Sequence, residues 1–383
     1  MPEKGVPLVV PFKILYTIPN FNTAGSGIPL LKIAQEFDRN YFIPEIACLH
    51  DKGDLFQDVM KSGIKVHLID LYKNARPIPS MLWKCYQLSM VFKQIKPDII
   101  HSYNYAADYT EPLAAKMARI KWVYTKKNMS WEGPSYRGWR LRSWLADGII
   151  CQNTDMLICF FPNWQKAELI PIGVDIDGYK KKLNNRGIRD QWNIPVNTRL
   201  IISVANLVPV KGIEILIGAF EKLSSSYPDW KLMIVGDDTT EYGLKLKKNV
   251  SKKRHLKGKI IFTGKQKNVR EFLDISEIYV QPTLNKGRKE GAPISILEAM
   301  ANGKIIIGSN ISGICDQLEP FSEHLFKAGN LAKLSNKMKN FMSNDRKTNK
   351  ILGEKFFDHV NNYYHLSNER KKLEYFYQKI ISK

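Results

Sequence analysis

Short apolar runs alternate with segments in which apolar residues recur every three or four positions. In the first half of the chain this pattern predicts strands at Lys13–Ile18, Pro44–Leu49, Lys65–Ile69, Asp98–His101, Trp122–Thr125 and Gly148–Cys151. The intervening helical spacing predicts helices at Ile28–Phe37, Leu55–Lys61 and Ser80–Lys93. Strands separated by helices indicate βαβ units and a parallel sheet.

The pattern restarts in the second half. It predicts strands at Arg199–Val204, Lys231–Val235, Lys259–Phe262, Ile278–Gln281 and Ile305–Ser309, with helices at Gly212–Ser224 and Pro293–Ala301. The fold class is therefore α/β, with two doubly wound, Rossmann-like domains at residues 1–180 and 181–360 and a closing helix over 361–383. The connector, residues 173–185, contains glycine, asparagine and a lysine run. Two such domains place a ligand in the cleft at the carboxyl ends of their strands.

Charge narrows the class of partner. The 383 residues carry a net charge of +21, and residues 181–383 contribute +16 of it. Such an excess favours an anionic partner, such as a nucleotide, a phosphate, a nucleic acid or an acidic membrane.

Cysteine spacing and hydropathy point to the cytoplasm. The five cysteines are odd in number and form no CxxC pair, so neither a zinc site nor a disulfide framework is expected. The run Val6–Phe12 is short and contains two prolines, which indicates the approach to a strand and not a signal peptide. No uncharged apolar stretch reaches the roughly 20 residues that span a bilayer.

The segment Glu290–Glu298 carries the most chemical information. Pro293 suits a first helical turn and Gly303 suits a helix end, so the helix begins just after Glu290. The free amides at Gly291, Ala292, Ile294 and Ser295 and the positive dipole end favour an anion there. From spacing alone, the simpler interpretation is that Glu290 is a capping acid and Glu298 an acid on the helix surface.

Lys211 and Gly212 form a second signal, because they open a helix directly after a strand and a loop. A cation at a helix N-terminus opposes the helix dipole, and a phosphate between the two makes the arrangement favourable. In isolation, Lys211 would be interpreted as a solvated surface lysine.

Four motifs in order resemble the family 4 glycosyltransferases of the GT-B architecture. They are the E-x7-E segment with EAMANG after it, the strand–loop–Lys211-Gly212 element, the residues Ile170–Asp175, and Ile234–Asp237. The N-terminal segment Lys13–Phe37 and Asp98–His101 also fit. The resemblance covers nearly the whole chain.

The resemblance implies transfer of a sugar from a nucleoside diphosphate donor, with retention at the anomeric carbon. It implies no cofactor and no metal, because lysine, amides and a helix dipole stabilise the leaving group. By position, Glu290 would contact the transferred sugar, Lys211 would neutralise the diphosphate and Glu298 would bind the ribose. The donor site would also include Ala292, Ile294 and Ser295, and Gly25 and Gly27 in a loop that approaches the donor. The closing helix would cross back to the first domain.

Two positions depart from the family pattern. Asn206 stands where an arginine is common, and a neutral amide cannot replace a bidentate cation. Arg288 or Lys289 would supply the charge, which the kinetics of their alanine variants would test. Lys127 stands where a histidine is common; it suits contact with a phosphate or sugar better than proton transfer. Lys127 and His101 are therefore acceptor-side candidates, with a surface lysine and a hydrogen-bonded structural histidine as the alternatives.

Basic and aromatic segments suggest a membrane surface. Lys245–Lys259 contains eight Lys and Arg residues and no acid, while Ser80–Lys93 and Trp131–Trp144 mix aromatic with basic residues. Polybasic segments bind anionic lipid, but a solvated helix face and ordinary core helices explain the same patterns. Nucleic acid is not expected as a partner, because no zinc-finger or RNA-binding signature is present.

The protein is therefore expected to be a cytoplasmic glycosyltransferase. If the basic and aromatic segments bind lipid, it would be peripheral on the inner face of the membrane. It would use a glycan or lipid-linked acceptor in bacterial-type surface polysaccharide assembly. Two alternatives remain open: a non-catalytic sugar-nucleotide-binding subunit, and a sugar-nucleotide isomerase of the same architecture.

Overall fold

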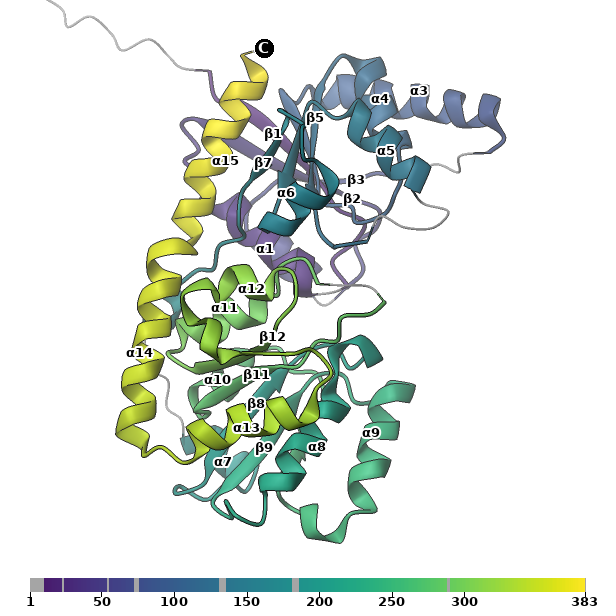
Figure 1. Cartoon of the computed structure of the whole chain (residues 1–383). Helices are drawn as coiled ribbons and strands as arrows, with labels where there is room; N and C mark the ends of the chain where they lie inside the picture. Colours follow the sequence, from purple (N-terminus) through teal and green to yellow (C-terminus); the bar gives the residue numbers. More distant parts are fainter. Residues whose placement is uncertain are drawn as a thin grey trace, which may run out of the picture. The chain divides into compact units, whose positions relative to one another are not determined.

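The structure is a computed structural model that describes residues 10–22, 24–53, 55–71, 76–130, 136–180, 186–287 and 290–382. The chain forms two units, one made of residues 1–173 and 366–383 and the other of residues 174–365 (Figure 1). The sequence placed these divisions near 180 and 361. Lys181–Asn185 of the predicted connector and residues 6–9 before the first strand lie outside the described residues.

Unit 1 is built on a parallel sheet in the order β3-β2-β1-β4-β5-β6-β7. Its strands are β1 (Phe12–Thr17), β2 (Phe42–Cys48), β3 (Val66–Leu68), β4 (Ile99–Ser102), β5 (Lys121–Lys126), β6 (Gly148–Cys151) and β7 (Ala167–Leu169). Its helices are α1 (Ala24–Glu36), α2 (Phe56–Lys61), α3 (Ile78–Ile95), α4 (Thr110–Ala118), α5 (Tyr136–Leu145), α6 (Thr154–Phe160) and α15 (Leu366–Ile381).

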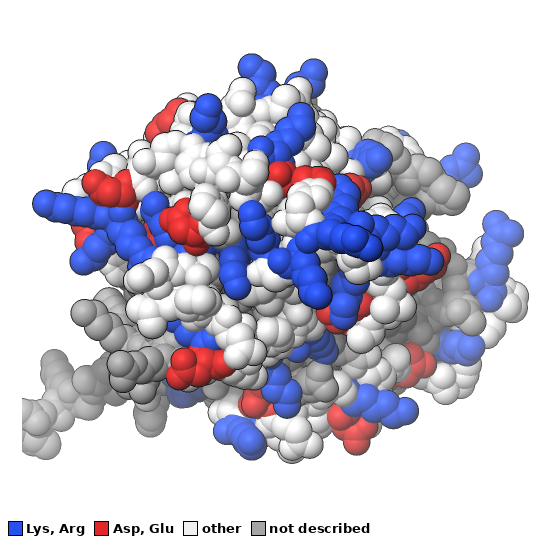
Figure 2. Space-filling model, turned by 90° about the horizontal axis from the view of Figure 1, so that it is seen from below, with Lys and Arg blue, Asp and Glu red and all other residues white. Residues whose placement is uncertain are grey.

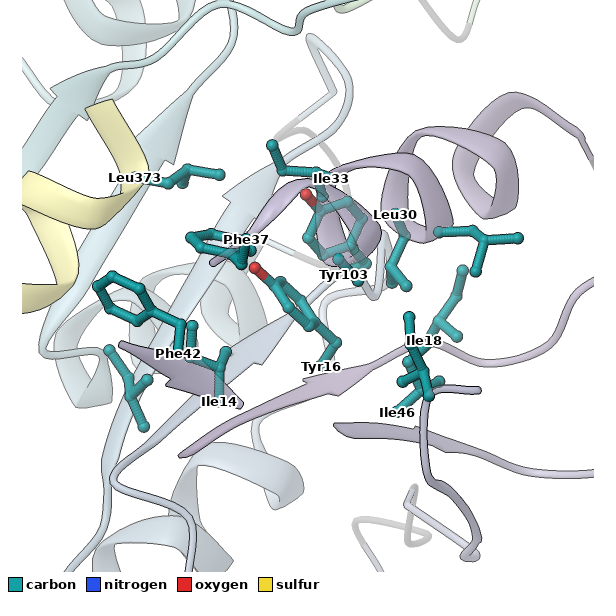
Figure 3. Packing of buried hydrophobic residues seen from close by; sticks show 14 of the residues in the cluster. Ile14, Tyr16, Ile18, Leu30, Ile33, Phe37, Phe42, Ile46, Tyr103 and Leu373 are labelled. Carbon is teal, nitrogen blue, oxygen red and sulfur yellow. The ribbon is translucent and has the colours of Figure 1, made fainter. Parts of the chain in front are cut away.

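Alternate residues of the central strands enter two separate cores. Ile14 and Tyr16 of β1 pack under α1 and α15, whereas Leu15 packs under α3 and α4. Figure 3 shows part of the first core, in which Tyr16, Phe37 and Tyr103 gather with residues of α1 and Leu373 reaches in from α15. Because a parallel sheet is covered on both faces, its strands carry continuous apolar runs. These apolar runs allow the strands to be predicted from the sequence.

Unit 2 has a second parallel sheet, in the order β10-β9-β8-β11-β12-β13. Its strands are β8 (Arg199–Val204), β9 (Trp230–Val235), β10 (Ile260–Phe262), β11 (Ile278–Gln281), β12 (Ile305–Ser309) and β13 (Leu325–Phe326). Its helices are α7 (Arg186–Gln191), α8 (Ile213–Leu223), α9 (Glu241–Ser251), α10 (Val269–Asp274), α11 (Ile294–Ala301), α12 (Ile314–Gln317), α13 (Leu331–Met342) and α14 (Arg346–Tyr363).

The closing helix that the sequence predicts over 361–383 is α15, which begins five residues later, at Leu366. A separate helix, α14, precedes it and ends at Tyr363. α14 belongs to unit 2, where Gly353 packs so closely on Gly303 that a Cβ at Gly353 would lie 1.9 Å from the Gly303 carbonyl oxygen. α15 belongs to unit 1 and buries Leu373, Phe376, Tyr377 and Ile380. The apolar spacing predicted the helical state but not the break at Tyr364–His365.

Among the described residues, no helix has both the length and the apolar character needed to cross a membrane.

Candidate functional site

The loop after β8 fixes the position of Lys211. The segment Pro209–Lys211 forms one 3-10 turn, and Gly212 follows with a φ of +64°, a conformation that glycine adopts without strain. A Cβ at Gly212 would lie 2.2 Å from the carbonyl oxygen of Pro282, which follows β11. Lys211 is therefore held where the carboxyl ends of β8 and β11 meet, the edge at which doubly wound sheets bind ligands.

Lys211 pairs directly with Glu290. The Lys211 ammonium donates a hydrogen bond to Glu290 Oε1, and each side chain is only 19% exposed. Glu290 precedes α11, whose N-cap is Pro293; among the described residues no side chain caps this helix end. A cation, a carboxylate and uncapped amides thus meet at one helix N-terminus. An anionic ligand there gains both the dipole and the Lys211 charge.

Neighbouring segments hold the start of α11 in place. A Cβ at Gly313 would lie 2.0 Å from the Gly291 carbonyl oxygen, and Gln317 Nε2 donates to the Pro293 carbonyl at 3.2 Å. Ser295 is oriented inward, because its hydroxyl is 2.8 Å from the Tyr279 hydroxyl. The Ser295 side chain therefore packs beneath the helix end. Donor binding by the amides of Ala292, Ile294 and Ser295 stays a prediction.

Glu298 lies one turn into α11 and is half-buried. Burial raises the pKa of Glu298 to about 7, because the charged carboxylate is poorly solvated there. Tyr179 is close enough that the Glu298 charge helps to raise the pKa of its hydroxyl. A carboxylate in this environment gains most from a ligand that donates hydrogen bonds to it, such as a sugar diol.

The Glu298 carboxyl predicts a specific dependence of stability on pH. Its pKa is higher in the folded than in the unfolded chain, so unit 2 should lose stability as pH rises from about 4.5 to 7. Glu298→Gln is expected to raise the unfolding free energy of unit 2 by about 1–3 kcal/mol at pH 8 and by much less at pH 4.5. Thermal melts at both pH values measure this. An equal effect at both pH values would contradict the assignment.

For Asn206, the structure does not show which side chain supplies the charge of the family's arginine. Asn206 is exposed in the loop after β8, and its backbone carbonyl accepts a hydrogen bond from the Val208 amide at 2.9 Å. Arg288 and Lys289 lie outside the described residues. Compensation for the family's arginine therefore stays a prediction.

Gly25 and Gly27 lie in the first turns of α1 and not in a loop, so the predicted start of this helix at Ile28 is wrong. Glycine's low helix propensity hid the earlier start. Gly27 is closely packed, since a Cβ there would lie 3.0 Å from the Phe21 side chain and 3.1 Å from the Leu55 side chain, whereas a Cβ at Gly25 would have open space around it. Their role in donor binding stays a prediction.

His101 is a buried structural residue. It is 0% exposed, and its two ring nitrogens lie 2.6 Å from the Tyr377 hydroxyl and 2.8 Å from the Thr125 hydroxyl. Burial lowers the pKa of His101 well below its usual value, so the ring is neutral. The predicted acceptor contact of His101 is corrected, because both nitrogens are occupied inside unit 1.

Lys127 lies directly after β5 and is half-buried. Its ammonium lies 3.9 Å from the centre of the Tyr103 ring. Burial lowers the pKa of Lys127 and raises that of Glu369 on α15, while each charge opposes the shift of the other. The acceptor-side role of Lys127 stays a prediction. Glu369 was missed because nothing in sequence connects residues 242 positions apart.

A second buried polar cluster was also missed. Glu111 of α4 accepts hydrogen bonds from Thr17 and, at 2.8 Å, from Ser102, which end β1 and β4. Arg142 of α5 donates to the Ser102 hydroxyl at 3.1 Å and to the Asp108 carbonyl at 2.7 Å. Both charged residues are 0% exposed. The cluster therefore fixes the loop between β4 and α4 at the carboxyl edge of the unit 1 sheet.

Comparison with protein families gives two matches that follow the two units. Residues 25–177 match the model of Glycosyltransferase Family 4, and residues 184–356 match the model of Glycosyl transferases group 1.

Individual relatives share a quarter to a third of their residues with this chain over the aligned segments. An uncharacterized glycosyltransferase of Haemophilus influenzae is 32% identical over 131 residues, which is 34% of this chain and 35% of the relative. The UDP-Gal:alpha-D-GlcNAc-diphosphoundecaprenol alpha-1,3-galactosyltransferase of Escherichia coli is 26% identical over 295 residues, 73% of each chain. The chain thus matches about a third of the first relative's length and nearly three quarters of the second's.

Solved structures share the architecture. Anabaena HepE, crystallised in complex with UDP and glucose, superposes with a TM-score of 0.79 at 18% identity, over 95% of this chain and 98% of that one. At this identity the likeness shows the fold, which is GT-B. Both domain models name glycosyl transfer, and the motifs at Lys211 and at Glu290–Glu298 meet at one sheet edge of unit 2. The chain belongs to the family 4 glycosyltransferases and is a glycosyltransferase of the GT-B fold.

Proposed function

We propose that this enzyme transfers a sugar from a nucleoside diphosphate donor to a glycan or lipid-linked saccharide during assembly of a bacterial surface polysaccharide. The E. coli relative is named for a UDP-sugar donor and a lipid diphosphate-linked acceptor, and HepE was crystallised with UDP. We also propose that the enzyme works in the cytoplasm. None of the five cysteines is in a disulfide, which agrees with a reducing compartment.

The observation that carries the proposal is the Lys211–Glu290 pair at the start of α11. The Lys211 ammonium and the amides of Ala292 and Ile294 would stabilise the charge that develops on the departing diphosphate. Glu290, released from Lys211 when a phosphate takes its place, would orient the hydroxyls of the transferred sugar. Glu298 would accept hydrogen bonds from the ribose. Lysine and amides would then do this work without a metal, and transfer would proceed with retention.

A thermal-shift screen of nucleoside diphosphate sugars tests donor binding. The correct donor at about 100 times its dissociation constant should add about 2.7 kcal/mol of apparent stability. We expect a UDP-sugar to give this shift and expect Glu298→Ala to reduce it. A complete screen in which no sugar nucleotide stabilises the protein would contradict the proposal.

The same protein separates the alternative functions. A transferase releases nucleoside diphosphate and forms a new glycosidic bond only when an acceptor is present, whereas an isomerase converts the donor sugar alone. A binding subunit shows the thermal shift without turnover. The anomeric configuration of the product, measured by proton NMR, decides between retention and inversion.

A further inference from the structure

Two helices of unit 1, α3 and α5, expose several large apolar side chains. On α3 the exposed residues are Ile78, Leu82, Trp83, Tyr86 and Met90, between 41% and 61% exposed. Four of them repeat every four residues and thus form one stripe along the helix. The opposite side of α3 is already buried, through Met81, Cys85, Leu88 and Phe92. α3 is therefore apolar on two sides but buried on only one, so its exposed apolar side is available to contact a binding partner.

α5 exposes a second set of large apolar side chains. Trp144 is 70% exposed, Tyr136 47% and Leu141 39%. Together with Arg137, Arg140 and Trp164, these side chains line a groove of about 450 Å³. Both helices cover the same face of the unit 1 sheet, and each packs beside α4 (Figure 1). The exposed groups therefore belong to one layer of the domain.

The charge of this layer selects its partner. Neither Ile78–Lys96 nor Tyr136–Ala146 contains an acidic residue, while Lys84, Lys93, Arg137 and Arg140 are all exposed. Tryptophan and tyrosine prefer the boundary between lipid headgroups and acyl chains, and Lys and Arg bind anionic headgroups. Because neither helix carries an acidic residue, the positive charge of these side chains complements the phosphates of an anionic headgroup layer.

The basic segment Lys245–Lys259 of unit 2 differs in character. Lys247 pairs with Asp238 at 2.9 Å, Lys253 pairs with Glu221, and Lys259 donates to the Ser224 carbonyl at 2.6 Å. Leu244 of α9 is the large apolar side chain that this region exposes, among the residues described. Figure 2 shows Lys and Arg spread over one face with Asp and Glu between them. This region has charge without an apolar surface that could insert into lipid.

We propose that the exposed faces of α3 and α5, here called the α3–α5 surface, dock this enzyme onto an anionic phospholipid membrane. The indole and phenol rings enter the headgroup boundary, and Arg137 and Arg140 bind lipid phosphates. The inference stands on these side chains alone and holds for any acceptor.

Sedimentation of the full chain with vesicles tests the α3–α5 surface. Equimolar phosphatidylglycerol–phosphatidylcholine vesicles should bind the protein at low salt, with weaker binding at moderate salt, and pure phosphatidylcholine should bind it far less. Trp83→Gln with Trp144→Gln, and separately Arg137→Gln with Arg140→Gln, should each lower the partition coefficient about tenfold or more. Each variant must keep the wild-type melting temperature and the thermal shift with the donor.

Matched controls come from unit 2. Ile351→Gln with Tyr363→Gln removes exposed apolar groups of α14, and Lys245→Gln with Lys248→Gln and Lys252→Gln removes charges from the α9 region; both should bind vesicles like the wild type. The proposal is overturned if anionic vesicles bind no protein at low salt, or if the α9 variant loses binding and the α3–α5 variants retain it. Absent vesicle binding with a concentration-dependent dimer that Trp83→Gln weakens would instead identify a self-association surface, and would also overturn it.

Discussion

Lys211→Ala is expected to lower kcat for sugar transfer by about 10²–10³-fold, with a much smaller change in the KM for the donor. The ammonium lies at the uncapped start of α11, paired with Glu290 and 19% exposed. A charge held in such a partly dry position stabilises a developing anion more than the same charge in water. Because the diphosphate gains negative charge as the sugar leaves, the loss should fall on the transition state.

Two further variants sharpen the test of Lys211. Glu290→Gln removes the partner charge while keeping the shape, and the double variant should cost less than the product of the two single effects if the residues act as a unit. Lys253→Ala is a matched control, because it removes another Lys–Glu pair of unit 2, the one with Glu221. Steady-state kinetics and melts of all four proteins are needed. Lys211→Ala with wild-type kcat would remove Lys211 from the catalytic machinery.

Arg142→Ala is expected to destabilise unit 1 by about 3–5 kcal/mol, because it leaves the Glu111 carboxyl buried without its cation. Arg142 also lies 4.7 Å from the Trp122 ring and 4.9 Å from the Tyr124 ring, so packing is lost with the charge. Burial already raises the pKa of Glu111, and the Arg142 charge opposes that rise. Removal of Arg142 should raise the pKa of Glu111 further, so that Glu111 takes up a proton on folding. Because protons are scarcer at high pH, the loss of unfolding free energy should be larger at pH 8 than at pH 5.

The melting temperature of unit 1 measures the Arg142 effect, which should amount to roughly 10 °C. Arg140→Ala, on the same helix but exposed, should change it by no more than a degree or two. Arg142→Met combined with Glu111→Gln should recover part of the loss, because it removes both buried charges and keeps much of the volume. An equal response of Arg142→Ala and Arg140→Ala would show that the buried cluster contributes nothing to stability.

The local pattern of apolar residues was sufficient to predict most strands of the two sheets. The strands at Gly148–Cys151, Arg199–Val204, Ile278–Gln281 and Ile305–Ser309 have the predicted bounds. The stripe from Ile213 to Leu223 is buried as predicted. These elements were readable because a parallel strand is apolar throughout and a covering helix repeats every 3.6 residues. The motifs at Lys211 and Glu290 were readable because a strand end, a turn and a helix start follow each other locally.

Other features depended on partners distant in the sequence. Nothing local shows that Tyr377 would occupy the ring nitrogen of His101, or that Glu369 would influence Lys127, since α15 returns to unit 1 from the end of the chain. The glycines of α1 looked like a loop because helix propensity is weak and packing overrides it.

Two α/β domains, the family and the elements that carry Lys211, Glu290 and Glu298 follow from short-range periodicity and spacing along the chain. Which charges meet depends on how the chain packs. Packing pairs Lys211 with Glu290, buries His101 in a hydrogen-bonded network and leaves Trp83 and Trp144 exposed. Burial and pairing are properties of the packed chain. A side chain's pKa, reach and accessibility therefore follow from its neighbours in space, which the order of residues does not list.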